Sequence, residues 1–348
     1  KKAFQRNDTH KCLKIFKDIN SWKKRIKFLK KKYKENVIII NTVQSISLNS
    51  FKINFFLKEK KIKILEFIYK LSLVTSLSRK IDFPRIRQFL NTLIFNRDKL
   101  YNYCTQNFFL NLKKILNIYP TYIMKIGKVS NQLINKEVKI LEGNADDYNM
   151  YLSSKNNKGN IIKENYGLFL EAPTPLFEGD SFITKDDPKI YGEAKEWFEH
   201  LNKFFNFFEK NFKIKIKIAP HPKIDHKKKY PNFYYGREVL NAKLPDVARY
   251  SKFFISRFST AMSFAVIYNK PAIFVTTNKI MNGPKYNFQK FYSSEYGTRP
   301  INIDNQFNLS DLKKAYKIDR KLYGRYKEEY LTVRNDNKKN YEIISKLF

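Results

Sequence analysis

Cysteine, long apolar runs and acidic residues are all scarce in this sequence. The two cysteines, Cys12 and Cys104, have no partner at C-x-x-C spacing and no nearby pair of histidines. This excludes a disulfide framework and a cysteine zinc site, and two unpaired thiols, buried or inert, fit a reducing cytoplasm. The longest apolar runs, at residues 253–256 and 271–275, fall far short of the roughly 20 residues that cross a bilayer. No spanning helix is predicted.

A secretory signal is also missing from the beginning of the sequence. The first residue is Lys1, and no basic region, apolar region and small-residue cleavage site follow it in order. We therefore expect a cytoplasmic protein, held at most peripherally at the inner membrane.

The excess of basic residues is the strongest compositional feature. The chain carries 68 Lys and Arg against 32 Asp and Glu, a formal net charge of +36, with the lysines spread along its length. One interpretation is the coding bias of an AT-rich genome acting on solvated positions. A second is a basic face that holds the protein against anionic lipids. Nucleic-acid binding comes third, because no zinc finger, helix-turn-helix or aromatic ribonucleoprotein motif accompanies the charge.

Length and apolar pattern predict two α/β domains. A chain of 348 residues exceeds the size at which one core stops growing, and a hydrophobic content of 43% can fill two. In the first half, the β-branched run at residues 37–41 is typical of a parallel strand buried on both faces. Residues 61–69 and 119–126 are further candidate strands, with a helix at 100–116 between them. This half has no G-x-G-x-x-G motif, so no phosphate loop fixes its topology.

The second half alternates strands and helices. Residues 194–212 repeat apolar side chains at helical spacing, which indicates a helix that packs on a core. The alternation predicts a parallel sheet with crossover helices and with ligands at the carboxyl ends of the strands. The predicted strands are residues 166–171, 213–219, 253–256 and 271–276, and the further helices are residues 244–251 and 259–268.

The polar, turn-rich residues 156–160 are the predicted linker between the domains. We therefore divide the chain into an N-terminal Rossmann-like domain at residues 1–158 and a C-terminal Rossmann-like domain at residues 159–305. Residues 306–348 are charged and helical in pattern, and form the predicted C-terminal helices.

An anion site is predicted where a buried strand runs into a Ser/Thr-rich helix start. Free N–H groups and the positive end of the helix dipole favour a phosphate there, and the hydroxyls of Ser259 and Thr260 can add hydrogen bonds. Arg257 would add a positive charge. Ser263, at the end of the same segment, is included in the predicted site. A plain Ser/Thr N-cap is the alternative interpretation.

A turn that contains a histidine bears on the choice between an anion site and a plain N-cap. His221 directly follows a predicted strand, so it belongs to the same carboxyl edge of the same sheet. The flanking prolines, Pro220 and Pro222, hold the ring in place, and an imidazole can donate to a phosphate or to a sugar carboxylate. Lys223 adds positive charge. A lone histidine in a turn is more often incidental, but its pairing with the downstream helix start favours a binding site.

These motifs resemble the nucleotide-binding motifs of bacterial sialyltransferases and Kdo transferases. More broadly, residues 166–277, about a third of the chain, resemble GT-B glycosyltransferases of capsule and O-antigen clusters. The shared pattern is an acidic strand end, His-Pro-Lys at residues 221–223, Ser-Thr-Ala at 259–261, Asn-Lys-Pro at 269–271 and an apolar strand.

The resemblance implies an α/β fold of the GT-B type, with two Rossmann-like domains whose parallel sheets face a central cleft, and with C-terminal helices that cross back onto the first domain. It implies a glycosyltransferase that moves a nonulosonic acid, sialic-acid-like or Kdo, from its CMP form to a cell-surface polysaccharide or lipopolysaccharide. The nucleotide sugar would bind the C-terminal domain and the glycan or glycolipid acceptor the N-terminal side. Contact with an anionic membrane is compatible with this, and no nucleic acid is expected. The alternatives are a UDP-hexose transferase or a UDP-sugar epimerase on the same fold, or a basic nucleic-acid-binding protein.

Glycosyl transfer needs a base for the acceptor hydroxyl, or a nucleophile. Glu171 ends the first strand of the second domain, and Asp180 lies in the next loop. The stretch Glu178-Gly179-Asp180 only loosely matches an acidic motif that the family carries in its N-terminal domain. Asp147 lies near the interdomain cleft. Each carboxylate alone is best interpreted as a solvated acid or a helix cap. We predict that at least one member of the group is catalytic, with Glu171 and Asp180 ahead of Asp147.

No essential metal is predicted, and no cofactor besides the donor. The sequence has no Asp-x-Asp motif, and the adjacent acids Asp146-Asp147 and Asp186-Asp187 need not converge on one ion. Helix dipoles and basic residues can carry the phosphate charge instead.

Overall fold

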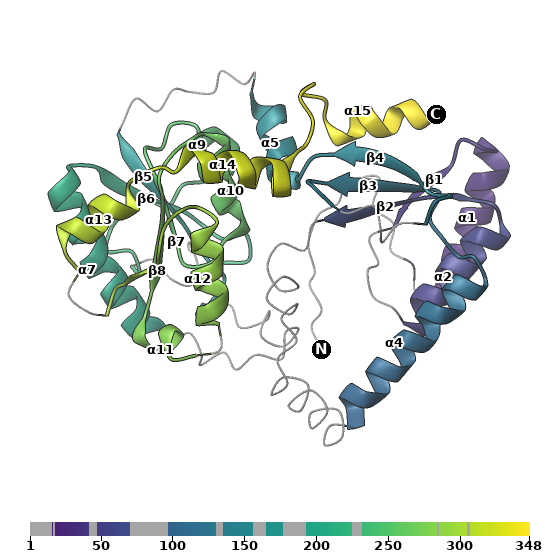
Figure 1. Cartoon of the computed structure of the whole chain (residues 1–348), viewed down its shortest axis with the longest axis horizontal. Helices are drawn as coiled ribbons and strands as arrows, with labels where there is room; N and C mark the ends of the chain where they lie inside the picture. Colours follow the sequence, from purple (N-terminus) through teal and green to yellow (C-terminus); the bar gives the residue numbers. More distant parts are fainter. Residues whose placement is uncertain are drawn as a thin grey trace.

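Two α/β units, each built on a parallel sheet, make up the described part of the chain (Figure 1). The predicted linker, and with it the predicted boundary after residue 158, lies outside the described residues. The computed structural model describes residues 16, 18–41, 47–69, 97–129, 135–155, 165–176, 193–224, 232–283, 285–304 and 307–348.

Two expectations from composition can be compared with these residues. None of the helices within the described ranges has the length and apolar composition that a membrane crossing requires. Cys104 is a free thiol, but it is exposed on the surface of a helix rather than buried. Cys12 lies outside the described residues.

The first sheet has four parallel strands in chain order. The three strands predicted in this half are confirmed as β1, β2 and β3. The fourth was not predicted, because its five residues, Lys-Ile-Leu-Glu-Gly, are mostly exposed and contain only two apolar side chains in a row. The strands are β1 (Ile38–Asn41), β2 (Lys63–Tyr69), β3 (Tyr122–Ile126) and β4 (Lys139–Gly143).

Helices α1, α2 and α4 belong to this unit. The first begins where the carboxylate of Asp18 accepts from the N–H groups of Asn20 and Ser21 at 2.7 and 2.8 Å, a side-chain N-cap. On one face of the sheet, Ile26 of α1 and Phe56 of α2 pack in a small core with residues of β1 and β2. The helix predicted at residues 100–116 is confirmed as α4. Their bounds are α1 (Ile19–Tyr33), α2 (Leu48–Glu59) and α4 (Arg97–Ile115).

The second sheet has five parallel strands in the order β6-β5-β7-β8-β9. Counted from β5, this is the order 2-1-3-4-5 of a doubly wound sheet, with helices on both faces. The predicted fold class, α/β with two parallel sheets flanked by helices, is confirmed. All four predicted strands exist, and only the two-residue β9 was not predicted. They are β5 (Tyr166–Leu170), β6 (Lys215–Ala219), β7 (Phe254–Ser256), β8 (Ala272–Thr276) and β9 (Ile301–Asn302).

Helix α7 (Ala194–Phe212) covers one face of this sheet, with the bounds that its apolar repeat predicts. Trp197, Leu201, Phe204, Phe205 and Phe208 are all buried, so the stripe is core, as predicted. Alternate residues of β7 and β8 face this helix or the opposite side, which explains why both strands are apolar throughout.

The other face is covered by short helices. The helix predicted at residues 259–268 is split into a 3-10 turn and a short α-helix, and the one predicted at 244–251 ends three residues early. Helices α11 and α12 were not predicted. The bounds are α9 (Leu244–Ala248), the 3-10 turn η3 (Thr260–Met262), α10 (Ser263–Ile267), α11 (Asn278–Met281) and α12 (Tyr286–Ser294).

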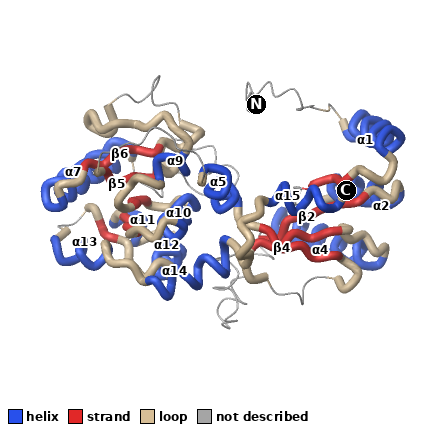
Figure 2. Tube along the Cα trace, turned by 90° about the horizontal axis from the view of Figure 1, so that it is seen from above, coloured by secondary structure: helices blue, strands red, loops and turns tan. Residues whose placement is uncertain are grey.

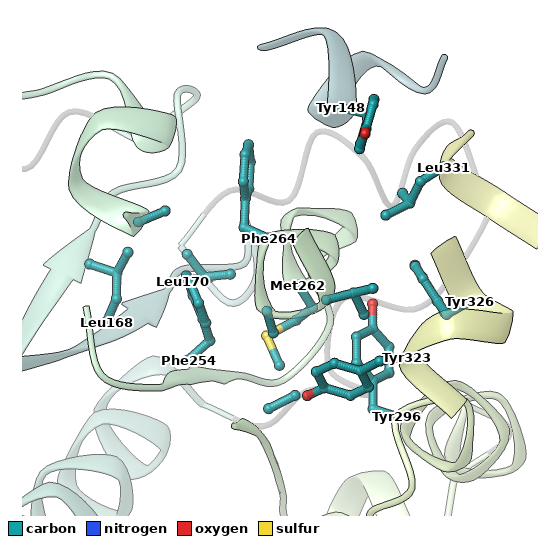
Figure 3. Close-up of a cluster of buried hydrophobic side chains, with 14 of the residues drawn as sticks. Tyr148, Leu168, Leu170, Phe254, Met262, Phe264, Tyr296, Tyr323, Tyr326 and Leu331 are labelled. Carbon is teal, nitrogen blue, oxygen red and sulfur yellow. The ribbon is translucent and has the colours of Figure 1, made fainter. Parts of the chain in front are cut away.

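Helix α5 (Asp146–Ser154) leaves the first sheet after β4 and packs on α9 and α10 of the second unit. Its Tyr148 lies in one buried cluster with Phe264 of α10, Tyr326 and Leu331 (Figure 3). The core of the second unit therefore includes side chains from both segments that connect the units, α5 and the C-terminal segment.

The C-terminal segment runs in the opposite direction, from the second unit to the first. Ile343 packs with Leu65 and Met124 on the face of the first sheet that α1 and α2 leave uncovered, and α15 lies over β4 (Figure 1). Its helices are α13 (Leu309–Ala315), α14 (Arg320–Tyr326), the π-helical turn η4 (Lys327–Leu331), α15 (Asn340–Ile344) and the 3-10 turn η5 (Ser345–Leu347).

Asn144, just after β4, fastens this segment to the first sheet. Its Oδ1 accepts from the hydroxyl of Thr332 at 2.6 Å, and its Nδ2 donates to the carbonyl oxygen of Lys338 at 2.7 Å. Its backbone N–H donates to Oδ1 of Asn340 at 2.8 Å. Asn144 is buried, so these bonds replace water and each counts toward stability.

A close backbone approach adds to this connection. Gly127, after β3, has a φ of +71°, and a Cβ there would lie 2.0 Å from the carbonyl oxygen of Glu329. The N–H of Lys128 donates to that same oxygen at 3.2 Å. Only glycine accommodates both the backbone conformation and the contact.

We expect Asn144→Ala to lower the free energy of unfolding by about 1–3 kcal/mol, because it leaves the hydroxyl of Thr332 and the carbonyl of Lys338 buried without this partner. Urea unfolding at neutral pH measures the change. Asn211→Ala, which removes an exposed amide that bonds within α7, is the matched control and should stay within about 0.5 kcal/mol of the wild type. Equal effects of the two substitutions would contradict the role of Asn144.

Candidate nucleotide-sugar site

A cavity of about 640 Å³ lies at the carboxyl edge of the second sheet. Its walls are the ends of β5 and β6 with the residues that follow them, residues 240–244, α9, residues 259–261 after β7 and Met150 of α5. The strand order reverses between β5 and β7, and ligands of doubly wound sheets bind at this switch point. His221, Ser259 and Thr260, far apart in sequence, are thus brought to one cavity.

The turn at His221 is fixed by hydrogen bonds. Its backbone N–H donates to Oε2 of Glu171 at 2.9 Å, and its ring Nδ1 accepts from the N–H of Lys223 at 3.3 Å. A neutral ring that accepts at Nδ1 carries its proton on Nε2, so Nε2 is a donor. Since His221 and Pro222 both line the cavity, the turn is suited to donate to an anionic group.

Glu171, the first-ranked carboxylate, is only 5% exposed and binds protein groups with both oxygens. Its Oε1 accepts from the hydroxyl of Tyr234 at 2.6 Å, while Oε2 accepts from the His221 turn. Burial and the charge of Glu171 raise the pKa of Tyr234 well above its ordinary value, and the charge of Arg257 opposes this. These contacts suit Glu171 to position the turn rather than to take a proton from an acceptor.

Ser259 and Thr260 lie on the cavity wall at the start of the 3-10 turn η3. The hydroxyl of Ser259 accepts from the N–H of Ala261 at 3.3 Å, which is the N-cap that the alternative interpretation expected. Its carbonyl oxygen accepts from the hydroxyl of Tyr292 at 2.9 Å, which fixes the turn to α12. Because α10 has only 5 residues, the helix dipole here is small, and local N–H and hydroxyl groups carry more of any anion binding.

Arg257 lies away from the cavity wall. It is 1% exposed, and its guanidinium lies 4.7 Å from the ring centre of Trp197 and donates to the carbonyl oxygen of Thr174 at 2.5 Å. The reason is strand alternation: Phe253 and Ile255 face α7, and Arg257 continues that series. Arg257 therefore does not reach the cavity, where the prediction placed its contact with a phosphate. Its guanidinium instead binds the loop after β5.

One wall of the cavity was not predicted. Residues 238–240 run beside β6, where Ile218 donates to the carbonyl oxygen of Glu238 and accepts from the N–H of Leu240, both at 2.8 Å. This pairing carries the next residues along the cavity, and Lys243 lines it, whereas Lys223 is exposed outside it. Nothing in the sequence of residues 232–244 indicates the pairing, because it depends on β6 being an edge strand.

Asp147 and Ser263 contact each other rather than the cavity. The hydroxyl of Ser263 on α10 donates to Oδ2 of Asp147 on α5, and neither residue lines the cavity wall. Burial raises the pKa of Asp147 to about 6, the hydrogen bond from Ser263 lowers it and the charge of Asp146 raises it further. The pair links the interdomain helix to the second unit.

Other predicted residues cannot be placed. Asp180 and Glu178 lie outside the described residues, as do Asp186 and Asp187. Within the parts of the chain that the structure covers, no three His, Cys, Asp or Glu side chains are grouped to hold a metal ion. A catalytic Asp180 and a metal-independent reaction stay predictions.

The sequence matches no protein-family model and no curated protein. Among solved structures, the chain is similar to the UDP-GlcNAc 2-epimerase of Methanocaldococcus jannaschii, with a TM-score of 0.49 and 13% identity over 94% of this chain and 81% of that one. It is also similar to MnaA of S. aureus with UDP (TM-score 0.44, 11% identity, 96% and 80% covered). For MurG of Acinetobacter baumannii, the TM-score is 0.37 at 8% identity, with 87% and 72% covered. These values are too low to assign a function, and the fold class rests on the strand order of the chain itself.

We expect Glu171→Gln to lower the free energy of unfolding by about 1–3 kcal/mol. The amide keeps one acceptor oxygen, so either the hydroxyl proton of Tyr234 or the N–H of His221 loses its acceptor on residue 171. Urea unfolding measures the loss. The exposed Glu142→Gln serves as the control and should change stability by less than about 0.5 kcal/mol. A Glu171→Gln protein as stable as the control would argue against the positioning role.

Asp147 should give the stability a specific pH dependence. Its pKa is raised from 3.8 to about 6 in the folded protein, so the folded state keeps the Asp147 proton up to a higher pH than the unfolded state does. Its contribution is full below about pH 4, is lost as pH rises to about 6 and is constant above, with a total on the order of 2–3 kcal/mol. Asp147→Asn has no such step.

The measurement is urea unfolding of wild type and Asp147→Asn between pH 4 and 7, with the difference between them plotted against pH. Other titrating groups cancel in that difference. The exposed neighbour Asp146→Asn should retain most of the wild-type slope. A difference that does not change with pH would rule out the assigned burial of Asp147.

Proposed function

We propose that this protein is a glycosyltransferase that binds a nucleotide sugar in the cavity of the second unit and transfers the sugar to a cell-surface glycan. The observation that carries the proposal is the position of the cavity at the switch point of a doubly wound sheet, with His221 and the Ser259–Thr260 turn on its wall. Its volume, about 640 Å³, suits a ligand of nucleotide-sugar size.

The charge around the cavity favours a donor with a single phosphate. Among the described lining residues, Lys243 is the one lysine or arginine, and His221 supplies a neutral donor. A nucleoside diphosphate brings two phosphates, each of which binds best to its own charged or N–H donors. A CMP-linked nonulosonic acid, sialic-acid-like or Kdo, has one phosphate, and a donor at Nε2 of His221 suits its sugar carboxylate.

The contacts of the carboxylates support a division of roles. Glu171 holds the His221 turn and Asp147 holds Ser263, so both have structural partners. We therefore keep Asp180, the other carboxylate that the sequence ranks first, as the acceptor base of this proposal, and keep the reaction metal-independent. The acceptor in this proposal is a polysaccharide or glycolipid that the enzyme meets from the cytoplasm at an anionic membrane.

Titration with nucleotides tests the proposal. We expect CMP to raise the melting temperature, because a ligand that binds only the folded state stabilises it, by about 2.7 kcal/mol at a hundredfold excess over Kd. His221→Ala should weaken CMP binding at least about tenfold, or about 1.4 kcal/mol, in calorimetry. His200→Ala, whose ring pairs with Asp304 and does not line the cavity, is the matched control and should bind CMP normally.

The other ligands separate the alternatives. Stabilisation by UDP and not by CMP would replace the donor and favour a UDP-hexose transferase or a UDP-sugar epimerase at the same cavity. No response to CMP, CDP, UDP or GDP, together with salt-sensitive binding of random DNA, would overturn the enzyme in favour of a basic nucleic-acid-binding protein.

A further inference from the structure

Helix α4 exposes a row of large apolar side chains. Tyr101, Phe108 and Ile115 are 71%, 61% and 76% exposed. Steps of seven residues keep them along one side of a helix. We call these three residues the α4 stripe.

The stripe continues onto α2. Leu48 and Phe55, again seven residues apart, are each nearly half exposed. Ring contacts connect the two helices: Phe51 lies 6.1 Å from Phe55 and 5.4 Å from Phe109, whose ring is 5.3 Å from that of Phe108. The apolar surface is therefore continuous across both helices rather than a set of scattered side chains.

Helix α1, beside α2, supplies the charge. Trp22 of α1 packs on Phe56 of α2 with ring centres 5.8 Å apart, and the ammonium of Lys30 donates to the carbonyl of Lys60. Both helices lie at the end of the first unit away from the second unit (Figure 2). Helix α1 contains no acidic residue and seven basic ones: Lys23, Lys24, Arg25, Lys27, Lys30, Lys31 and Lys32.

An exposed apolar band beside a strongly basic helix combines the two attractions that hold peripheral proteins on a membrane. Apolar side chains enter the boundary between headgroups and acyl chains, and lysines are attracted to anionic headgroups. A nucleic acid would use the charge and could stack bases on the aromatic rings, but it offers nothing for the aliphatic Leu48 and Ile115.

We propose that α1, α2 and α4 form a surface that binds a bilayer of anionic phospholipid. This deepens the proposed function, on which it rests for its purpose: a membrane-bound acceptor would meet the enzyme at the first unit, while the second unit binds the donor. The binding itself needs no donor and can be measured alone.

The test is co-sedimentation of the full chain with vesicles. We expect binding to phosphatidylcholine vesicles that contain phosphatidylglycerol, weakening with salt, and little binding to phosphatidylcholine alone. The triple variant Tyr101→Ser, Phe108→Ser, Ile115→Ser should bind the anionic vesicles at least about tenfold more weakly. Lys24→Glu, Lys27→Glu, Lys31→Glu, all exposed on α1, should do the same.

The matched control is the double variant Tyr341→Ser, Phe348→Ser. Both residues are about as exposed as the α4 stripe, but they belong to the C-terminal segment, whose α15 packs on the other face of the first sheet. It should bind vesicles like the wild type. Equal weakening in the control and in the stripe variant would overturn the assignment of the surface.

Three further results would overturn the proposal. The first is wild-type binding of random DNA without vesicle binding. The second is a dimer in analytical ultracentrifugation that the stripe variant converts to monomer while no protein binds vesicles, which would make the surface an interface between two copies. The third is unchanged vesicle binding by both multiple variants.

Nucleotide titration of the same variants separates the two proposals. The stripe variant should keep the CMP-induced rise in melting temperature, which also shows that it is folded. If the wild type does not bind vesicles but CMP still raises its melting temperature, the membrane surface alone is overturned. Vesicle binding without any nucleotide response overturns the proposed function and leaves a membrane-binding protein.

Discussion

The candidate site depends on one buried carboxylate. Glu171 accepts from the hydroxyl of Tyr234 with one oxygen and from the backbone of His221 with the other, so it joins the ends of β5 and β6 to the segment that follows β6. An ionised carboxylate in this place without partners would be strongly unfavourable, and the turn without an acceptor would leave an N–H unsatisfied. The charge and the turn therefore stabilise each other, and the cavity wall is defined by that pair of contacts.

The rest of the second unit makes this edge rigid. Its central strands β5, β7 and β8 carry buried side chains on both faces, with α7 on one side and the short helices on the other, so packing fixes the strand ends near the cavity. The connection to the first unit combines apolar packing of Tyr148 and Ile343 with polar contacts at Asn144 and at the Asp147–Ser263 pair. Of these polar contacts, the Asp147–Ser263 pair responds to pH, because Asp147 titrates with a pKa of about 6 in the folded protein.

The two units also differ in what they present to solvent. The second unit carries the cavity with its polar lining residues, while the first carries a basic helix and exposed rings on its outer helices. The basic residues of α1 are already clustered in the sequence, and folding places them beside the aromatic rings of α2. The separation of the donor cavity from the basic, apolar surface fits an enzyme that binds a water-soluble donor on one unit and a membrane-bound acceptor through the other.

Periodicity predicts the apolar strands and the bounds of α7, and the rule that parallel strands end at one edge predicts that His221 and Ser259 share a sheet edge. The sequence by itself could not determine contacts between segments far apart in the chain. Strand alternation directs Arg257 to Trp197, a partner 60 residues away, and edge pairing with β6 brings Lys243 to the cavity in place of Lys223. Likewise, Asp147 meets Ser263 only because α5 packs on α10. Local patterns fix which residues stand on an edge, and tertiary packing decides what each of them touches.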